Sequence, residues 1–108
     1  MVADGMKSMA GMTGGLAQVR VENERETPQG WRYRVVVERA GAASTEHEVT
    51  LSWVDHEHWC GGRFAPSTVV ERLFAVLLER GEEIPARFDA ATARRWFREL
   101  DGDLMRRL

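Results

Sequence analysis

Apolar and polar residues alternate with a period of two through much of the first half of the sequence. In WRYRVVVERA, residues 31–40, the aromatic residues share one face with two valines, and Arg32 and Arg34 lie on the other. The segment TEHEVTLSW, residues 45–53, alternates in the same way, and a GAAS turn separates the two segments. Two such runs joined by a glycine-containing turn predict an antiparallel hairpin with one face exposed to water.

A shorter alternating run, AQVRVEN, precedes the hairpin and predicts an optional third strand of a meander. On the water-exposed face, Arg32 and Arg34 are expected to lie opposite Glu46 and Glu48. Such cross-strand pairs of opposite charge favour this pairing of the strands.

From Pro66 the apolar residues follow a helical period. The segment PSTVVERLFAVLLERG has a proline in its first turn, Ser67 and Thr68 as capping residues and Gly81 as a stop. Its apolar side chains cover an arc of about 200°, whereas a helix on one surface needs a stripe of only about 100°. We therefore expect this helix to be buried from two sides.

A second helix is predicted in AATARRWFRELDG, with Asp89 as its N-cap and Gly102 as its end. The last residues, DLMRRL, would then form a frayed or docking tail. In the connection GEEIPARF, Ile84 and Phe88 are the expected core residues.

These elements predict one α+β domain over residues 17–108. It has an antiparallel two- or three-stranded sheet with two helices packed on one face. Residues 1–16 hold four of the five methionines and four of the ten glycines, and we interpret them as a flexible leader.

Composition narrows the class of protein. A chain of 108 residues with 44% hydrophobic and 30% charged residues has room for one core and is too apolar for a disordered protein. No apolar run approaches the roughly 18 residues that cross a bilayer, so no membrane segment is predicted.

A single cysteine excludes an internal disulfide and indicates a reducing cytoplasm. Fourteen arginines against one lysine indicate a GC-rich bacterial genome, and a net charge of −2 argues against a generic polyanion binder.

The segment WVDHEHWCGG, residues 53–62, gathers the residue types most often found in sites. His56, His58 and Cys60 are all permissible metal ligands, and their spacing would place all three on one face of a strand. In a helical turn only His56 and Cys60 share a face. Ser52 as a cap and the Gly-Gly stop favour the helical turn, with Trp59 inserted at the edge of the core.

No catalytic residue and no cofactor are predicted. Cys60 follows two acidic residues and would lie at the C-terminal end of a short helix, where the helix dipole disfavours a thiolate. Trp31 and Trp53 fall on the same predicted sheet face as Val35 and Leu51, which indicates core packing rather than a stacking platform.

An arginine face near the C-terminus is the second candidate surface. It consists of Arg94, Arg95, Arg98, Arg106 and Arg107. These side chains could contact the phosphates of a nucleic acid. They alternate with Glu99, Asp101 and Asp103, however, which is typical of a solvated face.

The block VVERLFAVLLER, followed by Ile84, RFD and WF, resembles a group of small uncharacterised bacterial proteins. Proteins of this group share a hairpin, a helix ending in LLER and a closing helix with FD and an aromatic-Phe pair. The match runs from about Thr45 to Leu100, and HEHWC departs from it. The resemblance implies an α+β fold and carries no activity with it.

We therefore expect a non-enzymatic interaction or regulatory module of the bacterial cytoplasm. A helix that is apolar on two sides would leave part of its surface to a protein partner or to a second copy in a homodimer. Two alternatives stay open: a nucleic-acid-associated protein using the arginine face, and a metal-binding protein at His56, His58 and Cys60.

Overall fold

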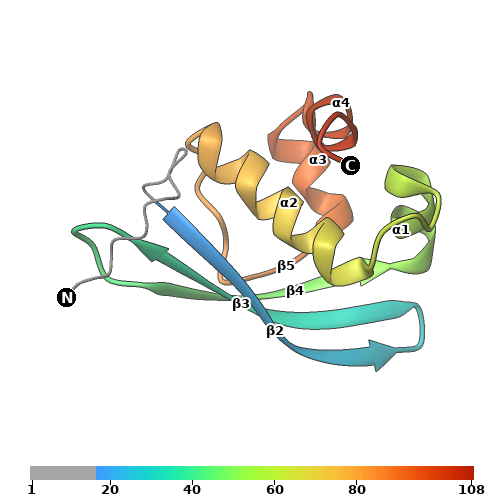
Figure 1. Ribbon diagram of the computed structural model, residues 1–108, viewed down its shortest axis with the longest axis horizontal. Helices are drawn as coiled ribbons and strands as arrows, with labels where there is room; N and C mark the ends of the chain where they lie inside the picture. The colour runs from blue at the N-terminus through green and yellow to red at the C-terminus, as the bar shows by residue number, and fades with distance from the viewer. Residues whose placement is uncertain (1–16) are drawn as a thin grey trace.

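The computed structural model describes residues 17–108, and the predicted leader lies outside this range. A four-stranded sheet carries all the helices of this range on one face (Figure 1). The strands are β2 (Ala17–Thr27), β3 (Gly30–Arg39), β4 (Thr45–Ser52) and β5 (Arg87–Asp89). The helices are α1 (Trp53–Cys60), α2 (Pro66–Glu79), the 3-10 helix η2 (Ala90–Thr92), α3 (Ala93–Trp96) and α4 (Leu100–Met105). None of these helices has both the length and the apolar character needed to cross a membrane.

The α+β class is confirmed, but the sheet differs from the prediction of two or three antiparallel strands. Strands β2, β3 and β4 form the expected antiparallel meander. The fourth strand, β5, pairs in parallel with β4 and places Phe88 beside Val49. At three residues, β5 is too short to show a period in the sequence. It is held by tertiary contacts: Phe88 is buried, and the backbone N–H of Glu48 donates to the carbonyl of Ala86 at 2.7 Å.

The expected charge pairing across the exposed sheet face is present. Arg34 lies directly opposite Glu48 in the register of β3 and β4. The ion pairs run diagonally, from Arg32 to Glu48 at 3.2 Å and from Arg34 to Glu46 at 2.6 Å. Side chains on the opposite face of the same strands, including Tyr33, form the core.

Helix α2 is buried from two sides, as its wide apolar arc predicts. It lies between the sheet and the other helices, in contact with β2, α1 and α4 (Figure 1). Its buried side chains are Val69, Val70, Leu73, Phe74, Val76 and Leu77. Leu78, the remaining large apolar residue of the arc, is half-buried against the core, so little of the arc is open to a partner. That α2 offers part of it to a second copy stays a prediction.

The two ends of α2 are capped in different ways. At the start, Pro66 occupies the first turn but Ala65 is the N-cap, so the expected side-chain cap from Ser67 or Thr68 is absent. At the end, Gly81 has a φ of 70°, and its N–H donates to Leu78 while that of the next residue donates to Leu77. This is a Schellman motif, which needs the left-handed conformation that glycine adopts without strain.

The C-terminal region is not the single helix that the sequence predicted. The backbone at Phe97 is extended, with φ −132° and ψ 97°, and this break separates α3 from α4. Gly102 is therefore internal to α4 rather than a stop. Of the two alternatives for the last residues, a frayed or a docking tail, the frayed one is wrong, because Asp103 and Leu104 are buried within α4. Burial of the Phe97 side chain against the core outweighs the preference of these residues for one continuous helix.

Candidate functional site

Helix α1 forms on the segment that carries the candidate metal ligands, as the helical interpretation predicted. The Ser52 hydroxyl oxygen accepts the backbone N–H of Asp55 at 3.0 Å and its O–H donates to the Asp55 carboxylate at 2.9 Å. Gly61, with φ 62°, ends the helix by donating its N–H to the carbonyl of Glu57 at 2.8 Å. Both ends of this short helix are therefore fixed by local hydrogen bonds.

The three candidate metal ligands do not converge on one point: His56 and Cys60 approach a backbone carbonyl, and His58 points elsewhere. His56 Nε2 lies 2.6 Å from the carbonyl oxygen of Phe64, and Cys60 Sγ lies 3.9 Å from the same oxygen. A carbonyl only accepts, so His56 donates its Nε2 proton there and cannot use this nitrogen for a metal. His58 points away from both, toward Asp101. Within residues 17–108, no three His, Cys, Asp or Glu side chains are placed to hold a metal ion together.

Asp101 is the centre of a polar network that joins α1, α3 and α4. Its Oδ1 accepts from Trp59 Nε1 at 2.7 Å and from Arg94 Nε at 2.8 Å, and His58 Nε2 lies 3.3 Å from its Oδ2. Arg94 also reaches the buried Asp55 carboxylate at 3.2 Å. Its guanidinium carbon lies 4.7 Å from the centre of the Trp59 ring, within range of a cation–π contact. The expected burial of Trp59 is confirmed, at 2% exposure.

The charges in this network stabilise one another. Partial burial opposes ionisation of Asp101, but hydrogen bonds from Arg94, Trp59 and His58 outweigh it and hold the pKa of this carboxyl below its ordinary value. Burial likewise works against the charge on Arg94, and the two aspartates outweigh it, so that its pKa is raised. These side chains pair with one another across α1, α3 and α4, which makes the cluster a support for the helices.

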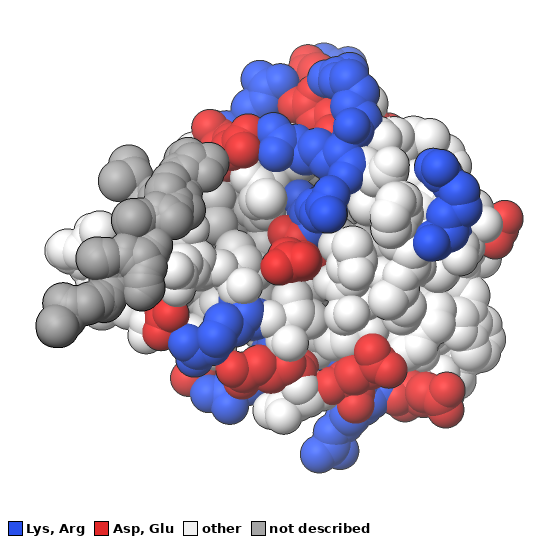
Figure 2. Space-filling view, in the orientation of Figure 1, with Lys and Arg blue, Asp and Glu red and all other residues white. Residues whose placement is uncertain are grey.

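Most arginines of the C-terminal arginine face are likewise paired with carboxylates of the chain. Arg94 is held in the Asp101 network, Arg106 donates to the buried Asp103, and Arg107 donates two hydrogen bonds to Glu79. The contact with Arg107 lowers the pKa of the Glu79 carboxyl. Arg95 and Arg98 are exposed and form no ion pair within the described range. Figure 2 shows basic and acidic side chains side by side at the top of the view, where α4 lies in Figure 1.

The structure thus provides no continuous positive surface among these five arginines. The nucleic-acid hypothesis stays a prediction that no contact in this region favours.

Trp31, Trp53 and Val54 form an exposed apolar surface, which we call the aromatic patch. Trp53 is 53% exposed and Val54 is 77% exposed, so the predicted core position of Trp53 is wrong. Trp31 is half-buried against the core, and its ring meets that of Trp53 edge to face at a centroid distance of 6.4 Å. Trp31 also contacts the ring of His56, at a centroid distance of 5.2 Å.

The exposure of Trp53 follows from the cap of α1. Because Ser52 ends β4 and begins the helix, Trp53 is the first helical residue and no longer follows the alternation of the strand. Its backbone N–H donates to the carbonyl of Gln29 at 2.9 Å, which ties it to the turn between β2 and β3. The sequence contained this signal, because the Ser52 cap and a strand continuing through Trp53 exclude each other.

Protein-family models, curated proteins and solved structures gave no match to this chain. The resemblance to small bacterial proteins therefore stays an expectation, and the proposals below rest on the geometry of the chain itself.

Proposed function

We propose that the protein is a non-enzymatic interaction module that associates with a second copy of itself through the aromatic patch. The observation that carries this proposal is the exposure of Trp53 and Val54, two large apolar side chains in consecutive positions. Exposed apolar clusters on small proteins are commonly interaction sites, and tryptophan is enriched among the residues that dominate binding energy.

The patch is held rigidly, which favours binding. Trp53 lies in the first turn of a helix capped at both ends, and its backbone is hydrogen-bonded to Gln29. Edge-to-face contact with Trp31 restricts the ring further. Association therefore costs less side-chain entropy at Trp53 than at a freely rotating residue, which favours affinity.

A second copy is the partner proposed because a two-fold interface needs only one self-complementary patch on each subunit. The arc of α2 is mostly covered within the chain, so the aromatic patch replaces it as the proposed surface. Flat aromatic side chains at the centre of such a patch can stack against their own symmetry copies.

Light scattering coupled to size-exclusion chromatography tests this proposal over a series of concentrations. We expect the wild-type mass to rise toward that of a dimer, and the double variant Trp53→Ser, Val54→Ser to remain a monomer. The matched control is Met105→Ser, because Met105 is 45% exposed but belongs to α4 rather than to the patch. A wild-type protein that stays monomeric at high micromolar concentration contradicts the proposal, and so does a double variant that dimerises normally.

A further inference from the structure

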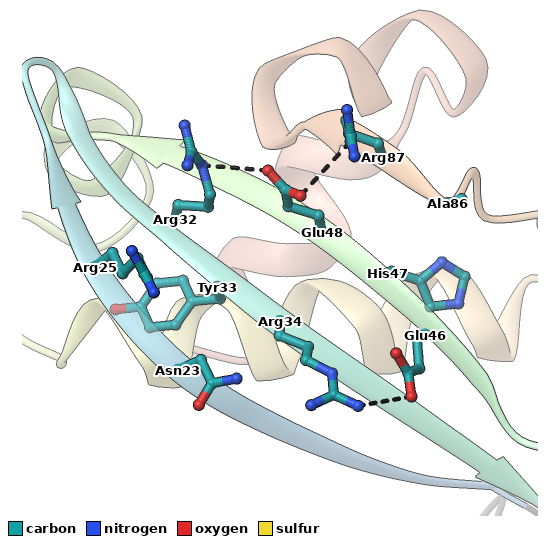
Figure 3. A pocket seen from close by; sticks show the side chains of 10 residues that line it. All are labelled: Asn23, Arg25, Arg32, Tyr33, Arg34, Glu46, His47, Glu48, Ala86 and Arg87. Atoms are coloured by element: carbon teal, nitrogen blue, oxygen red, sulfur yellow. Dashed lines mark hydrogen bonds and ion pairs between the residues drawn. The ribbon is translucent and has the colours of Figure 1, made fainter.

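The exposed face of the sheet carries a groove of about 690 Å³ that is lined by residues of all four strands (Figure 3). Six of these residues are charged: Arg25, Arg32, Arg34, Glu46, Glu48 and Arg87. The groove lies on the side of the sheet opposite to the helices and uses none of the aromatic patch.

A β-bulge in β2 determines which charge faces this groove. The register shifts by one residue between Glu22 and Arg25, where Asn23 adopts a φ of 56°. In a regular strand Glu24 would lie opposite Arg32, which is a favourable pair. With the bulge, Arg25 lies opposite Arg32 instead, and like charges directly opposite each other are destabilising.

The side chain of Glu24 contacts Tyr33 instead of Arg32. Its carboxylate accepts the hydroxyl proton of Tyr33 at 2.6 Å. Burial, together with this carboxylate, raises the pKa of Tyr33. Bulges that redirect a side chain are over-represented next to functional sites, and this bulge exchanges a carboxylate for a guanidinium at the groove.

The guanidinium groups at this end of the groove outnumber the carboxylates. Glu48 lies between Arg32 at 3.2 Å and Arg87 at 3.5 Å, so two arginines share one carboxylate (Figure 3). Arg25 has no carboxylate within ion-pairing distance among residues 17–108. The side chain of Arg87 is 81% exposed and that of Arg32 is 49% exposed, so their remaining N–H donors are accessible to a ligand.

We propose that this groove binds an acidic polypeptide segment, whose carboxylates accept hydrogen bonds from Arg25, Arg32 and Arg87. The planar guanidinium matches a carboxylate in a bidentate arrangement, and an added carboxylate relieves the repulsion between Arg25 and Arg32. This surface is separate from the aromatic patch, and the inference does not depend on self-association.

The lining of the groove favours a polypeptide over a nucleic acid. Glu46 and Glu48 would repel a continuous chain of phosphates, whereas a polypeptide can place neutral side chains beside them. The two aromatic rings of the lining, those of Tyr33 and His47, are 1% and 6% exposed and cannot act as a stacking platform for bases. Arg34 is already held by Glu46, which leaves the other three arginines to select the ligand.

Titration calorimetry with a short synthetic peptide of alternating Glu and Ser tests the proposal, and the same peptide with Gln in place of Glu is the ligand control. We expect the acidic peptide to bind the wild-type protein and the double variant Arg25→Gln, Arg87→Gln to bind at least about tenfold more weakly. The matched protein control is Arg95→Gln, Arg98→Gln, which removes the same charge from exposed positions in the helical layer. This control should keep the wild-type affinity.

Several outcomes overturn the proposal. These are no binding of the acidic peptide, equal binding of the Gln peptide, and unchanged affinity in the Arg25 and Arg87 variant. An oligonucleotide of the same charge that binds the wild-type groove more tightly than the peptide also overturns it. Far-ultraviolet circular dichroism confirms that each variant is folded, and Trp53→Ser should retain peptide binding because it alters only the aromatic patch.

Discussion

The helical layer and the sheet face both carry arginines, but they use them differently. In the helical layer, Arg80 donates to Asp103 at 3.0 and 2.6 Å, and Arg94 bridges Asp55 and Asp101. On the sheet face, Arg32 and Arg87 share Glu48, and Arg25 has no partner within the described residues. The first set links helices to one another, whereas the second set lies on the exposed face of the sheet.

The difference lies in the carboxylates. The Asp103 and Asp55 side chains are 10% and 12% exposed, so each depends on its arginine for the hydrogen bonds that water would otherwise supply. Glu48 is 38% exposed and keeps access to water. An arginine with a buried carboxylate partner is therefore structural, and one whose carboxylate partners are all exposed is available to a ligand. Arg94 is structural through the buried Asp55, because Asp101 is 40% exposed.

The largest effect is expected from Trp59→Ala, which removes the buried ring that donates a hydrogen bond to Asp101. Loss of this buried ring and of its hydrogen bond to Asp101 should lower the free energy of unfolding by about 3–5 kcal/mol in urea. Trp53→Ala, in the same helix but half-exposed, should cost less than about 1 kcal/mol. Similar losses for both variants would contradict the assignment of one tryptophan to the core and the other to the surface.

The next largest effect is expected from Arg94→Gln. This change leaves Asp55 and Asp101 without their shared cation and should cost about 1–3 kcal/mol in the same measurement. Arg25→Gln on the sheet face is the matched comparison, with a change within about 0.5 kcal/mol. If Arg25→Gln were as costly as Arg94→Gln, Arg25 would be structural and not a residue free for a ligand.

Acid should weaken the helical network through Asp101. Its pKa is lower in the folded state than in the unfolded chain, so its contribution is present above the unfolded pKa of about 3.9 and is lost as the pH falls through the folded value. Thermal unfolding between neutral and acid pH should therefore show a smaller loss of stability below about pH 4 in Asp101→Asn than in the wild type. An identical pH profile for the two proteins would exclude this carboxylate as a contributor.

The smallest effect is expected from the double variant Arg25→Gln, Arg87→Gln without ligand. Its melting temperature at low salt should equal or slightly exceed that of the wild type, because the substitution removes the repulsion between Arg25 and Arg32. Clear destabilisation would show that these arginines support the fold.

The periodicity of the sequence determined the elements whose signals are local. The meander, both ends of α1 and the two-sided burial of α2 follow from alternation, from the Ser52 cap and from the width of an apolar arc. The sequence signal for each of these lies in residues close together along the chain. The sequence also identified His56 and Cys60 as the pair sharing one side of α1, and both approach the Phe64 carbonyl.

The tertiary structure alone decided the rest. Strand β5, the break at Phe97 and the burial of Leu104 depend on the surface that each segment meets, and no local pattern contains that information. The pairing of the charged side chains also depends on the tertiary structure. All fourteen arginines are visible in the sequence, but only the fold shows which carboxylates are buried beside them and that a bulge at Asn23 turns Arg25 toward the groove. Local sequence preference determines whether a segment forms a helix or a strand. Burial and charge pairing between residues distant in the sequence then determine which of its side chains remain exposed.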